Sequence, residues 1–560
     1  MLSHPAEKYR PYPPIALPDR RWPEQQITRA PRWLSTDLRD GNQALAEPMD
    51  SARKLQFWDL LLECGFKEIE VAFPSASQTD FNFVRQLIDE QRIPEDVTIQ
   101  VLTQARDPLI LRTFEALRGA HRATVHLYNA TAPLFRELVF GMDKAEVIAL
   151  ATRATRLIRQ QCEQQPETRW QYEYSPETFC FTEPEFALEI CEAVADVWQP
   201  CAERPMIVNL PATVEVNTPN VYADQIEYFC RHFSRRSEVC ISVHPHNDRG
   251  TGVASAELAV MAGADRVEGC LFGNGERTGN VCLVTLAMNL YSQGIDPELR
   301  FEQMNRVVEV VENCNQIPVH PRHPWAGSLA YTAFSGSHQD AINKGTRYME
   351  ESGTEYWEVP YLPIDPADVG RQYEPIIRIN SQSGKGGSAF VMQHSFGFDL
   401  PKAMHPEFGH IVQVETDRVG KELKPNAIYD LFKAHYIDAV KPYQLVQHSF
   451  AEFTDEEGHS HVTFAGAIRH TDTVFQVQGS GNGPIDAFFN AIHGQKMDRF
   501  TFIDYKEHAV KQGSDSQAVA YIHLQDENGR DWFGVGMSHN INLAPLKGIL
   551  LSLIHICRCR

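Results

Sequence analysis

Long apolar runs are missing from this 560-residue sequence. None reaches the roughly 18 residues that a membrane-spanning helix needs. The N-terminal stretch MLSHPAEKYRPYPPIALPDRRWP also lacks the apolar core of a signal peptide. These absences predict a cytoplasmic protein with no membrane partner. The proline-rich residues 1–31 are expected to lie as an arm over the surface.

An excess of positive charge is missing as well, because the formal net charge is −21 at pH 7. This balance argues against nucleic acid or an anionic membrane surface as the main partner. Cysteine pairs of the CxxC type do not occur, although the chain has 12 cysteines. Cysteines scattered singly along a chain of this length predict reduced, mostly buried thiols.

Short apolar or β-branched runs recur from residue 32 onward, separated by polar turns and amphipathic stretches. They are RWLSTDL (32–38), EIEVAF (68–73), TIQVLT (98–103), ATVHLY (123–128), WQYEYS (170–175), MIVNLP (206–211), CISVHP (240–245) and RVEGCLF (266–272). The first amphipathic stretch carries helix signals, with Asp50 as N-cap and Gly65 at its end. Eight strand–helix units predict an α/β fold, a (β/α)8 TIM barrel over residues 32–315. A doubly wound open sheet is the alternative, but no dinucleotide-type glycine fingerprint follows the first run.

His244 and His246 stand one residue apart at the end of the seventh run. On a strand, residues i and i+2 point to one face, so both imidazoles should aim at the same place. Such a pair is often no more than two hydrogen-bonded polar side chains. In a barrel, however, Asp40 after the first run and Asn280 after the eighth would share their mouth. This set, which contains no cysteine, predicts an open site for Mg²⁺, Mn²⁺ or Zn²⁺.

Other polar residues fall at further strand ends. Arg39 is expected either to hold a developing oxyanion or to pair with an acidic residue in the mouth. Glu177 and Glu173 are candidate acid/base groups, although Glu173 could instead face the helical shell. Thr213 is a candidate for binding a substrate carboxylate, or a threonine bonded only to backbone. A metal in this mouth would polarise the ketone of a chelating 2-oxo acid.

The pattern changes beyond the barrel. Residues 316–435 mix helical stretches with Pro- and Gly-rich connections, and are expected to form linker subdomains that contribute to the active site. Within them, SQSGKGGSAF (381–390) is interpreted as a loop because it lacks the phosphate-loop spacing. Residues 436–550 contain two strand–strand–strand–helix halves, which predict a duplicated α+β regulatory domain. Residues 551–560 differ in composition from the rest of the chain and are interpreted as a non-native tail.

Several motifs resemble those of the 2-isopropylmalate synthases, from about residue 30 to residue 545. They are DLRDGNQ (37–43), HPHNDRGTGVASAELAVMAGADRVEGCLFGNGERTGN (244–280), GSHQDAINKG (336–345), VPYLPIDPADVGR (359–371), RINSQSGKGG (378–387) and GNGPIDA (481–487). The family belongs to a metal-dependent TIM-barrel superfamily of Claisen-condensing enzymes and lyases. The barrel motifs are shared with homocitrate and citramalate synthases, whereas the combination with the later motifs is more specific.

The resemblance implies a role for each residue at a matching position. The implied metal ligands are Asp40, His244 and His246, with Asn280 completing or supporting the set. The implied catalytic residues are Arg39, Glu177 and His338, the last reaching the mouth from a partner subunit. The implied 2-oxo acid pocket consists of Leu102, which would touch the isopropyl group, His126, Tyr128, Ser175 and Thr213. The implied leucine site consists of Asn482, Gly483, Pro484, Ile485 and Tyr505. Taken alone, His338 is an ordinary histidine, and GNGPIDA is a glycine turn entering a helix.

The activity that the resemblance implies is the first committed step of leucine biosynthesis. Acetyl-CoA, 3-methyl-2-oxobutanoate and water would give (2S)-2-isopropylmalate and CoA in a homodimer inhibited by leucine. The implied cofactor is Mg²⁺ or Mn²⁺, with K⁺ as a further monovalent cation. The general base is left open between Glu177 and His338 acting through a water molecule. The alternatives are homocitrate or citramalate synthase, a related acyl-CoA lyase, and a non-catalytic amino-acid sensor.

Overall fold

The computed structural model describes residues 1–375, 387–419, 423–438, 443–454, 460–493, 500–510 and 516–558. The chain forms two compact units. The first comprises Met1–Tyr331 and Pro363–Tyr373, and the second comprises Thr332–Leu362 and Glu374–Arg560. Residues 378–386 of the RINSQSGKGG motif lie outside the described residues. The stretch 381–390 is interpreted from the sequence as a loop, but its last four residues, 387–390, form the first turn of a helix, so the interpretation is wrong there.

The first unit contains a closed barrel of parallel strands in the order β1 to β8, which confirms the predicted TIM barrel. The strands are β1 (Arg32–Ser35), β2 (Glu68–Ala72), β3 (Thr98–Gln104), β4 (Arg122–Ala130), β5 (Arg169–Glu177), β6 (Met206–Ala212), β7 (Val239–Pro245) and β8 (Arg266–Gly269). Pairing of β1 with β8 closes the barrel, so the alternative of an open sheet is wrong.

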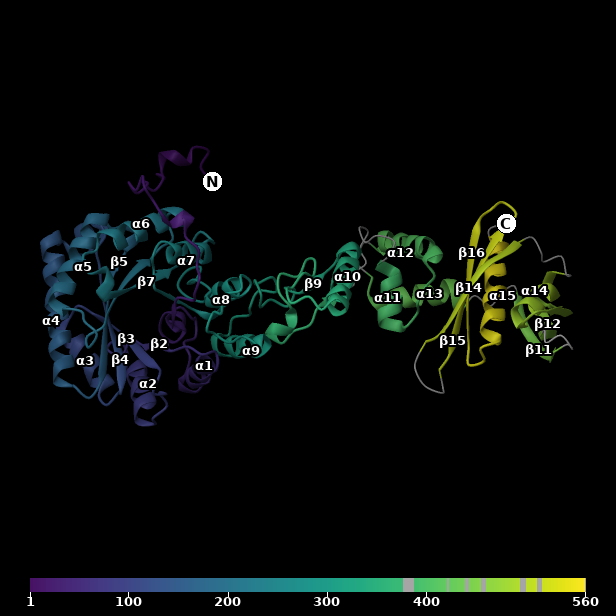
Figure 1. Ribbon diagram of the computed structural model, residues 1–560, viewed down its shortest axis with the longest axis horizontal. Coiled ribbons are helices and arrows are strands. Elements are labelled where there is room, and N and C mark those ends of the chain that lie inside the picture. The colour runs from purple at the N-terminus through teal and green to yellow at the C-terminus, as the bar shows by residue number, and fades with distance from the viewer. Residues whose placement is uncertain are drawn as a thin grey trace. The chain divides into compact units, whose positions relative to one another are not determined.

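Helices surround the strands of the barrel (Figure 1). They are α1 (Ser51–Glu63), α2 (Gln78–Asp89), α3 (Asp107–Leu117), α4 (Lys144–Gln164), α5 (Pro184–Trp198), α6 (Pro219–His232), α7 (Gly252–Met261), α8 (Leu283–Tyr291) and α9 (Met304–Asn315). Helix α1 begins as predicted, because the Asp50 carboxylate accepts the Arg53 amide at 2.8 Å. Within the described ranges, no helix combines the length and apolarity needed to cross a bilayer.

The first strand is shorter than the sequence predicts. It ends at Ser35, and Asp37–Gly41 then form a π-helical turn, η3. Hydrogen bonds to the end of β8 and the loop after it hold this turn in place. The Thr36 hydroxyl donates to the Gly269 carbonyl at 3.1 Å, and the Asp37 carboxylate accepts the Leu271 amide at 3.1 Å. The turn places two of its own residues, Arg39 and Asp40, at the carboxyl ends of the strands.

The interior of the barrel is polar. On β2, Glu68 and Glu70 alternate with Ile69 and Val71, and all four are buried. Glu68 bonds to Arg266, which is itself fully buried, so the glutamates face the barrel axis. The apolar residues between them therefore face the surrounding helices, since neighbouring side chains of a strand point to opposite faces.

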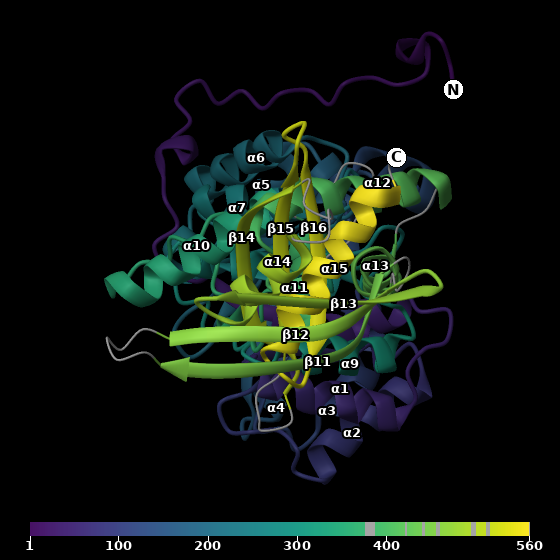
Figure 2. The same ribbon diagram turned by 90° about the vertical axis from the view of Figure 1, so that its right-hand side faces the viewer.

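The N-terminal arm is anchored on α6. Arg20 pairs with Asp224 at 2.9 Å, and the Trp22 indole donates to the same carboxylate at 2.8 Å. The Trp22 amide donates to Glu227 at 2.8 Å. These contacts hold the later part of the arm on the barrel, whereas residues 1–10 are exposed (Figure 2).

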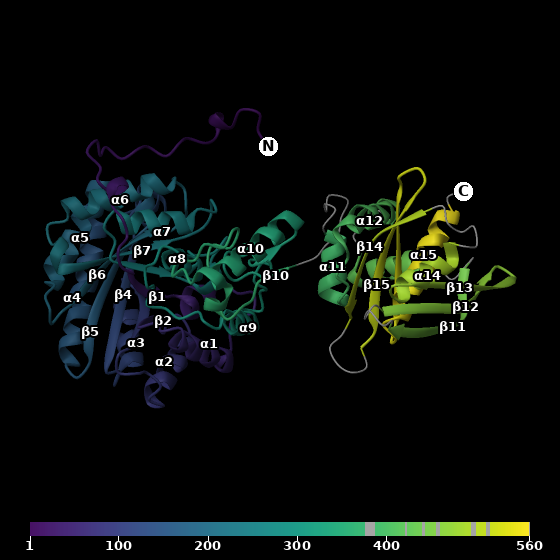
Figure 3. The same cartoon turned by 45° about the vertical axis from the view of Figure 1, so that its right-hand side comes forward.

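The second unit begins with β9 (Thr332–Ala333) and α10 (Gly336–Ser352), and β9 pairs with β10 (Glu374–Pro375). Its later elements are α11 (Gly387–Phe396), α12 (His405–Val419), α13 (Pro425–Phe432), β11 (Tyr443–Thr454), β12 (Ser460–His470), β13 (Thr473–Gly481), α14 (Pro484–His493), β14 (Phe500–Ala509), β15 (Ala518–Asp526), β16 (Asp531–Ser538) and α15 (Leu543–Arg558). Two antiparallel three-stranded sheets, each followed by a helix, confirm the duplicated α+β domain (Figures 2 and 3).

Strand β15 contributes to two hydrophobic cores. Val519 and Tyr521 pack with residues of α11, α12 and α13. Ile522 and Leu524 pack with residues of β12, α14 and α15. The sheet of the second half is therefore enclosed between two sets of helices.

The C-terminal helix extends past residue 550, the predicted end of the regulatory domain. Helix α15 continues to Arg558, and Leu551, Ser552 and Leu553 are buried. The Ser552 hydroxyl donates to the Gly548 carbonyl at 3.0 Å within this helix. Part of the stretch interpreted as a tail therefore packs as helix.

Close packing of β16 on α15 depends on glycine. A Cβ added at Gly536 would lie 1.8 Å from the Ala544 carbonyl oxygen, which belongs to the helix backbone. We expect Gly536→Ala to lower the unfolding free energy of the second unit by about 1–3 kcal/mol or more, which is the usual cost of overpacking a core. Thermal unfolding would show this as a lower Tm. Gly483→Ala is the matched control, since a Cβ there meets nothing within 4 Å. Equal Tm values for the two variants would contradict the expectation.

Candidate metal and substrate site

Asp40, His244 and His246 meet at the mouth of the barrel. Their potential ligand atoms all lie within 4.8 Å of one another, and all three residues are buried. Asp40 Oδ2 is 3.3 Å from His244 Nε2 and 3.8 Å from His246 Nε2. The structure therefore brings the three residues predicted to bind metal into one cluster, with His244 on β7, His246 directly after it and Asp40 in the turn after β1.

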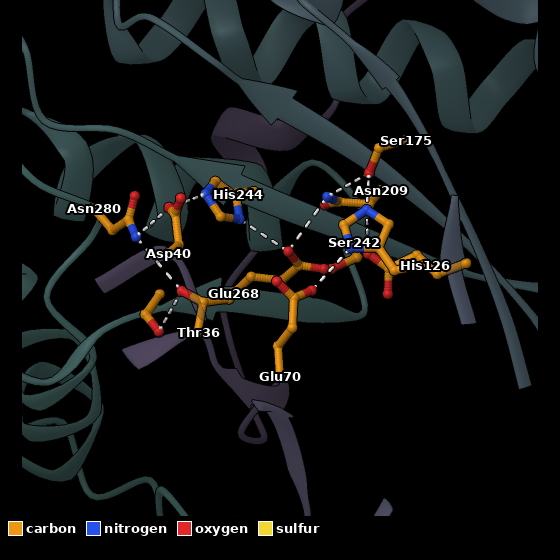
Figure 4. Close-up of polar contacts among 12 residues, drawn as sticks. Thr36, Asp40, Glu70, His126, Ser175, Asn209, Ser242, His244, Glu268 and Asn280 are labelled. Atoms are coloured by element: carbon orange, nitrogen blue, oxygen red, sulfur yellow. Dashed lines mark hydrogen bonds and ion pairs between the residues drawn. The ribbon is translucent and has the colours of Figure 1, made fainter. Parts of the chain in front are cut away.

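Asn280 lies beside this cluster. Its Nδ2 donates to Asp40 Oδ2 at 2.8 Å (Figure 4). Its Oδ1 is buried and has no hydrogen-bond partner. A buried amide oxygen without a partner is costly unless a ligand or ion takes it. Two imidazoles, a carboxylate and this oxygen together fit a divalent metal ion.

Burial and charge set the protonation of the cluster. Burial alone would raise the pKa of Asp40, but Arg39 and His244 hold it well below its usual range. Burial would lower the pKa of His244, yet hydrogen bonds to Asp40 and Glu268 raise it to about 9. Burial lowers the pKa of His246 to about 4. The cluster thus holds a proton on His244, which a divalent ion would have to displace on binding.

Arg39 forms the ion pairs with acidic residues that one of its two interpretations predicts, and its role toward an oxyanion stays a prediction. Its Nη1 donates to Asp40 Oδ1 at 2.7 Å, and its Nε donates to Glu70 on β2. The guanidinium is thus paired with acidic residues in the mouth. It also lines the cavity there, next to the cluster. Because two carboxylates fix its orientation, it can hold negative charge in the cavity with little rearrangement.

A cavity of about 840 Å³ opens at this mouth. It is lined by the three clustered residues and by the other residues expected from the sequence at the barrel mouth, apart from Asn280: Arg39, Leu102, His126, Tyr128, Ser175, Glu177 and Thr213. The volume falls within the range of small-molecule sites.

Three of these lining residues have their polar atoms oriented by neighbours. Ser175 Oγ is 2.7 Å from His126 Nε2 and accepts from Asn209 Nδ2 at 2.9 Å. The Tyr128 hydroxyl accepts from Gln104 at 2.8 Å. Thr213 accepts the Thr178 amide at 2.9 Å, which matches the interpretation as a backbone-bonded threonine. Its hydroxyl hydrogen remains available to a ligand.

The two candidate acid/base glutamates lie in different surroundings. Glu177 ends β5 and lines the cavity, and its burial raises its pKa although Arg39 opposes the shift. Glu173, four residues earlier on the same strand, is fully buried and pairs with Arg266. It therefore faces the barrel interior, and the alternative that it faces the helical shell is wrong.

Several polar residues of the site were not anticipated from the sequence. Glu268 contacts His244 Nδ1 at 2.9 Å, Glu70 contacts His126 Nδ1 at 2.9 Å, and Asn209 donates to Ser175. A signal was present, because Glu68 and Glu70, or Arg266 and Glu268, are spaced i and i+2 on their strands. The same spacing identified the two histidines.

His338 and the expected leucine residues belong to the second unit. His338 lies on α10 and stacks on Tyr361 with ring centroids 4.0 Å apart. Asn482 precedes α14, and its backbone amide donates to Asp486 at 2.9 Å. One amide of the turn expected to bind leucine is thus already used within the chain. Tyr505 is 45% exposed on β14. The roles of these residues stay predictions.

Family models match the chain in three consecutive parts. The HMGL-like model matches residues 30–311, which contain the barrel. The model for the alpha-isopropylmalate synthase post-catalytic domain-like region matches residues 328–393. The model for the LeuA allosteric (dimerisation) domain matches residues 422–555.

Close relatives match over nearly the whole chain. The 2-isopropylmalate synthase of Pseudomonas putida (strain W619) is 56% identical over 553 residues, covering 99% of this chain and 98% of the relative. The 2-isopropylmalate synthase of Pseudomonas savastanoi pv. phaseolicola (strain 1448A / Race 6) is 56% identical over 554 residues, with the same coverage. Among solved structures, the HMG-CoA lyase from Brucella melitensis matches with a TM-score of 0.42 and 16% identity, covering 52% of this chain and 100% of that chain.

A closed TIM barrel with a buried Asp–His–His cluster at its mouth defines a metal-dependent enzyme of the HMGL-like kind. The regions after the barrel and the identity to full-length relatives narrow this class further. The chain belongs to the 2-isopropylmalate synthase family.

Removing one imidazole tests the metal cluster. Loss of a residue that only orients a metal ligand typically weakens metal binding by about 10–100-fold. We expect His244→Ala to weaken Mn²⁺ binding by more than this, because it removes a ligand itself. Equilibrium dialysis of Mn²⁺ measures the change, and circular dichroism checks the fold. His323→Ala, which alters a half-buried histidine outside the cluster, is the control. Unchanged Mn²⁺ binding by His244→Ala would show that the ion binds elsewhere.

Proposed function

We propose that this protein condenses acetyl-CoA with 3-methyl-2-oxobutanoate and water, giving (2S)-2-isopropylmalate and CoA. The observation that carries the proposal is the match over 99% of the chain to proteins named 2-isopropylmalate synthase. The cavity supports it, because candidate metal ligands, an arginine, a glutamate and an apolar wall surround one space.

The 2-oxo acid would bind in the cavity beside Asp40, His244 and His246. A bound divalent ion, for which Mg²⁺ or Mn²⁺ is our proposal, supplies Lewis acidity that polarises the ketone. The Thr213 hydroxyl, whose oxygen is held by the Thr178 amide, donates to the substrate carboxylate. Leu102, which is 7% exposed in the cavity wall, receives the branched alkyl group.

Arg39 stabilises the charge that develops on oxygen. Asp40 and Glu70 hold its guanidinium on two sides, so its remaining N–H groups are oriented before the reaction begins. A donor oriented in advance lowers the barrier, since no reorganisation is needed as charge appears.

Glu177 is the proposed base that removes a proton from the acetyl methyl group. Burial raises its pKa, and a raised pKa makes its carboxylate a stronger proton acceptor. His338 of the partner subunit is the alternative base, acting through a water molecule. Hydrolysis of the thioester then makes the overall condensation irreversible.

Leucine is the proposed inhibitor, and a homodimer with shared active sites is the proposed assembly. The match to a LeuA allosteric (dimerisation) domain at residues 422–555 supports both. Asn482, Gly483, Pro484 and Ile485 before and within α14, together with Tyr505, form the proposed leucine site. A monovalent cation such as K⁺ as activator and a cytoplasmic location complete the proposal.

Release of free thiol from acetyl-CoA in the presence of Mg²⁺ or Mn²⁺ tests the substrate. We expect 3-methyl-2-oxobutanoate to give the highest kcat/KM, and added leucine to lower the rate. Preference for pyruvate would indicate a citramalate synthase, and preference for 2-oxoglutarate a homocitrate synthase. Cleavage of a 3-hydroxy-3-methyl acyl-CoA without condensation would indicate a lyase. Binding of leucine with no turnover of any 2-oxo acid would indicate a sensor.

The pH dependence of kcat tests Glu177. A base works as its carboxylate, so activity is lost as pH falls through the Glu177 pKa. Because that pKa is raised, the acidic limb should lie above the about 4.3 of an ordinary glutamate. The charges facing this group are those of Arg39 and, when ionised, Tyr128. Glu177→Gln should lower kcat by about 10²–10⁴-fold and remove this limb. An acidic limb that survives in Glu177→Gln would assign the base to another group.

A further inference from the structure

Glu268 on β8 contacts His244 on the side of the ring that faces away from Asp40. Its Oε2 lies 2.9 Å from His244 Nδ1, whereas Asp40 lies 3.3 Å from His244 Nε2. Glu268 is fully buried and His244 is 6% exposed. The imidazole is therefore held between two carboxylates, of which only Asp40 belongs to the metal cluster (Figure 4).

We propose that Glu268 is a positioning residue that fixes the ring and the tautomer of His244 for metal binding. A neutral imidazole carries one N–H, and a carboxylate that accepts from Nδ1 keeps the hydrogen there. The lone pair of Nε2 is then directed at the cluster. His246 is oriented in a related way, because its Nδ1 lies 3.1 Å from the Ala212 carbonyl oxygen. Only His244 is oriented by a charged group, which also strengthens it as a ligand.

Glu268 can serve this role because its own orientation is fixed. Its Oε1 accepts from Ser242 at 3.1 Å and from Arg266. Its Oε2, the oxygen that meets His244, also accepts from Asn209 at 3.3 Å. Donors from β6, β7 and β8 thus bond to both oxygens, and these hydrogen bonds hold the carboxylate toward the histidine.

The same contacts link the metal cluster to the substrate pocket. Asn209 donates to Glu268 and also to Ser175, at 2.9 Å. Ser175 is in turn 2.7 Å from His126. A continuous chain of buried hydrogen bonds therefore joins the pocket wall at His126 to Nδ1 of the proposed metal ligand His244 (Figure 4).

Two variants of Glu268 separate its charge from its position. Glu268→Gln keeps an acceptor oxygen at the same reach but removes the charge. Glu268→Asp keeps the charge beside Arg266 but withdraws the oxygens by one methylene. We expect each to weaken metal binding by about 10–100-fold, because both disturb the group that orients His244. At saturating metal, the turnover of Glu268→Asp should be closer to that of the unchanged protein than its metal affinity is.

The measurement is Mn²⁺ binding to the metal-stripped full-length protein, followed by the electron paramagnetic resonance signal of free Mn²⁺. Glu68→Gln is the matched control. Glu68 accepts from the same Arg266 at 2.8 Å, but its other partner is Arg32 rather than a histidine. It should bind Mn²⁺ with the affinity of the unchanged protein. Thermal unfolding of every variant monitors the fold.

Each outcome bears on a different statement. Unchanged affinity in both Glu268 variants would overturn the proposed positioning role. An equal loss in Glu68→Gln would also overturn it, since the effect would then act through Arg266. If Glu268→Gln does not fold, Glu268→Asp decides, because it preserves the charge that compensates Arg266. The inference rests on the proposed metal site, and that site fails separately if the unchanged protein does not bind Mn²⁺.

Discussion

Compensation of buried charge inside the barrel is the constraint on which the active site depends. Arg266 is fully buried and reaches three glutamates, Glu68, Glu173 and Glu268, from three different strands. An uncompensated charge in such a place costs about 3–5 kcal/mol. These ion pairs therefore link β2, β5 and β8, which are not neighbours in the barrel, across its interior.

This polar interior explains how the mouth of the barrel can hold several charged groups in fixed orientations. Glu70 fixes Arg39 and His126, and Glu268 fixes His244, so the cavity-facing residues stand on a layer of charged residues beneath them. Most TIM barrels fill this layer with branched apolar side chains. Here the apolar side chains of the strands, such as Ile69 and Val71, pack instead between the barrel and the surrounding helices.

The sequence was sufficient to predict the strands, because β-branched runs separated by helical stretches recur along the first half of the chain. It also predicted the cluster of Asp40, His244 and His246, since strand alternation and barrel closure place them together. It did not reveal the layer of Glu70, Arg266 and Glu268. Charged residues in otherwise apolar runs are ambiguous until the identity of the inward face is known. The turn at Asp37–Gly41 was also missed, because its hydrogen bonds are made to the distant end of β8.

Because β15 packs in two hydrophobic cores, the two halves of the duplicated C-terminal domain have different surroundings. Two copies of one motif would ordinarily be interchangeable, with equal responses to a ligand bound at either. Here Val519 and Tyr521 of the second copy share a core with α11, α12 and α13, while Ile522 and Leu524 share one with the first copy. Among the described residues, β15 of the second copy is thus shared by the core of the first copy and the core of those helices. The two halves of the repeat are therefore not equivalent, because only the second shares a hydrophobic cluster with α11, α12 and α13 among the described residues.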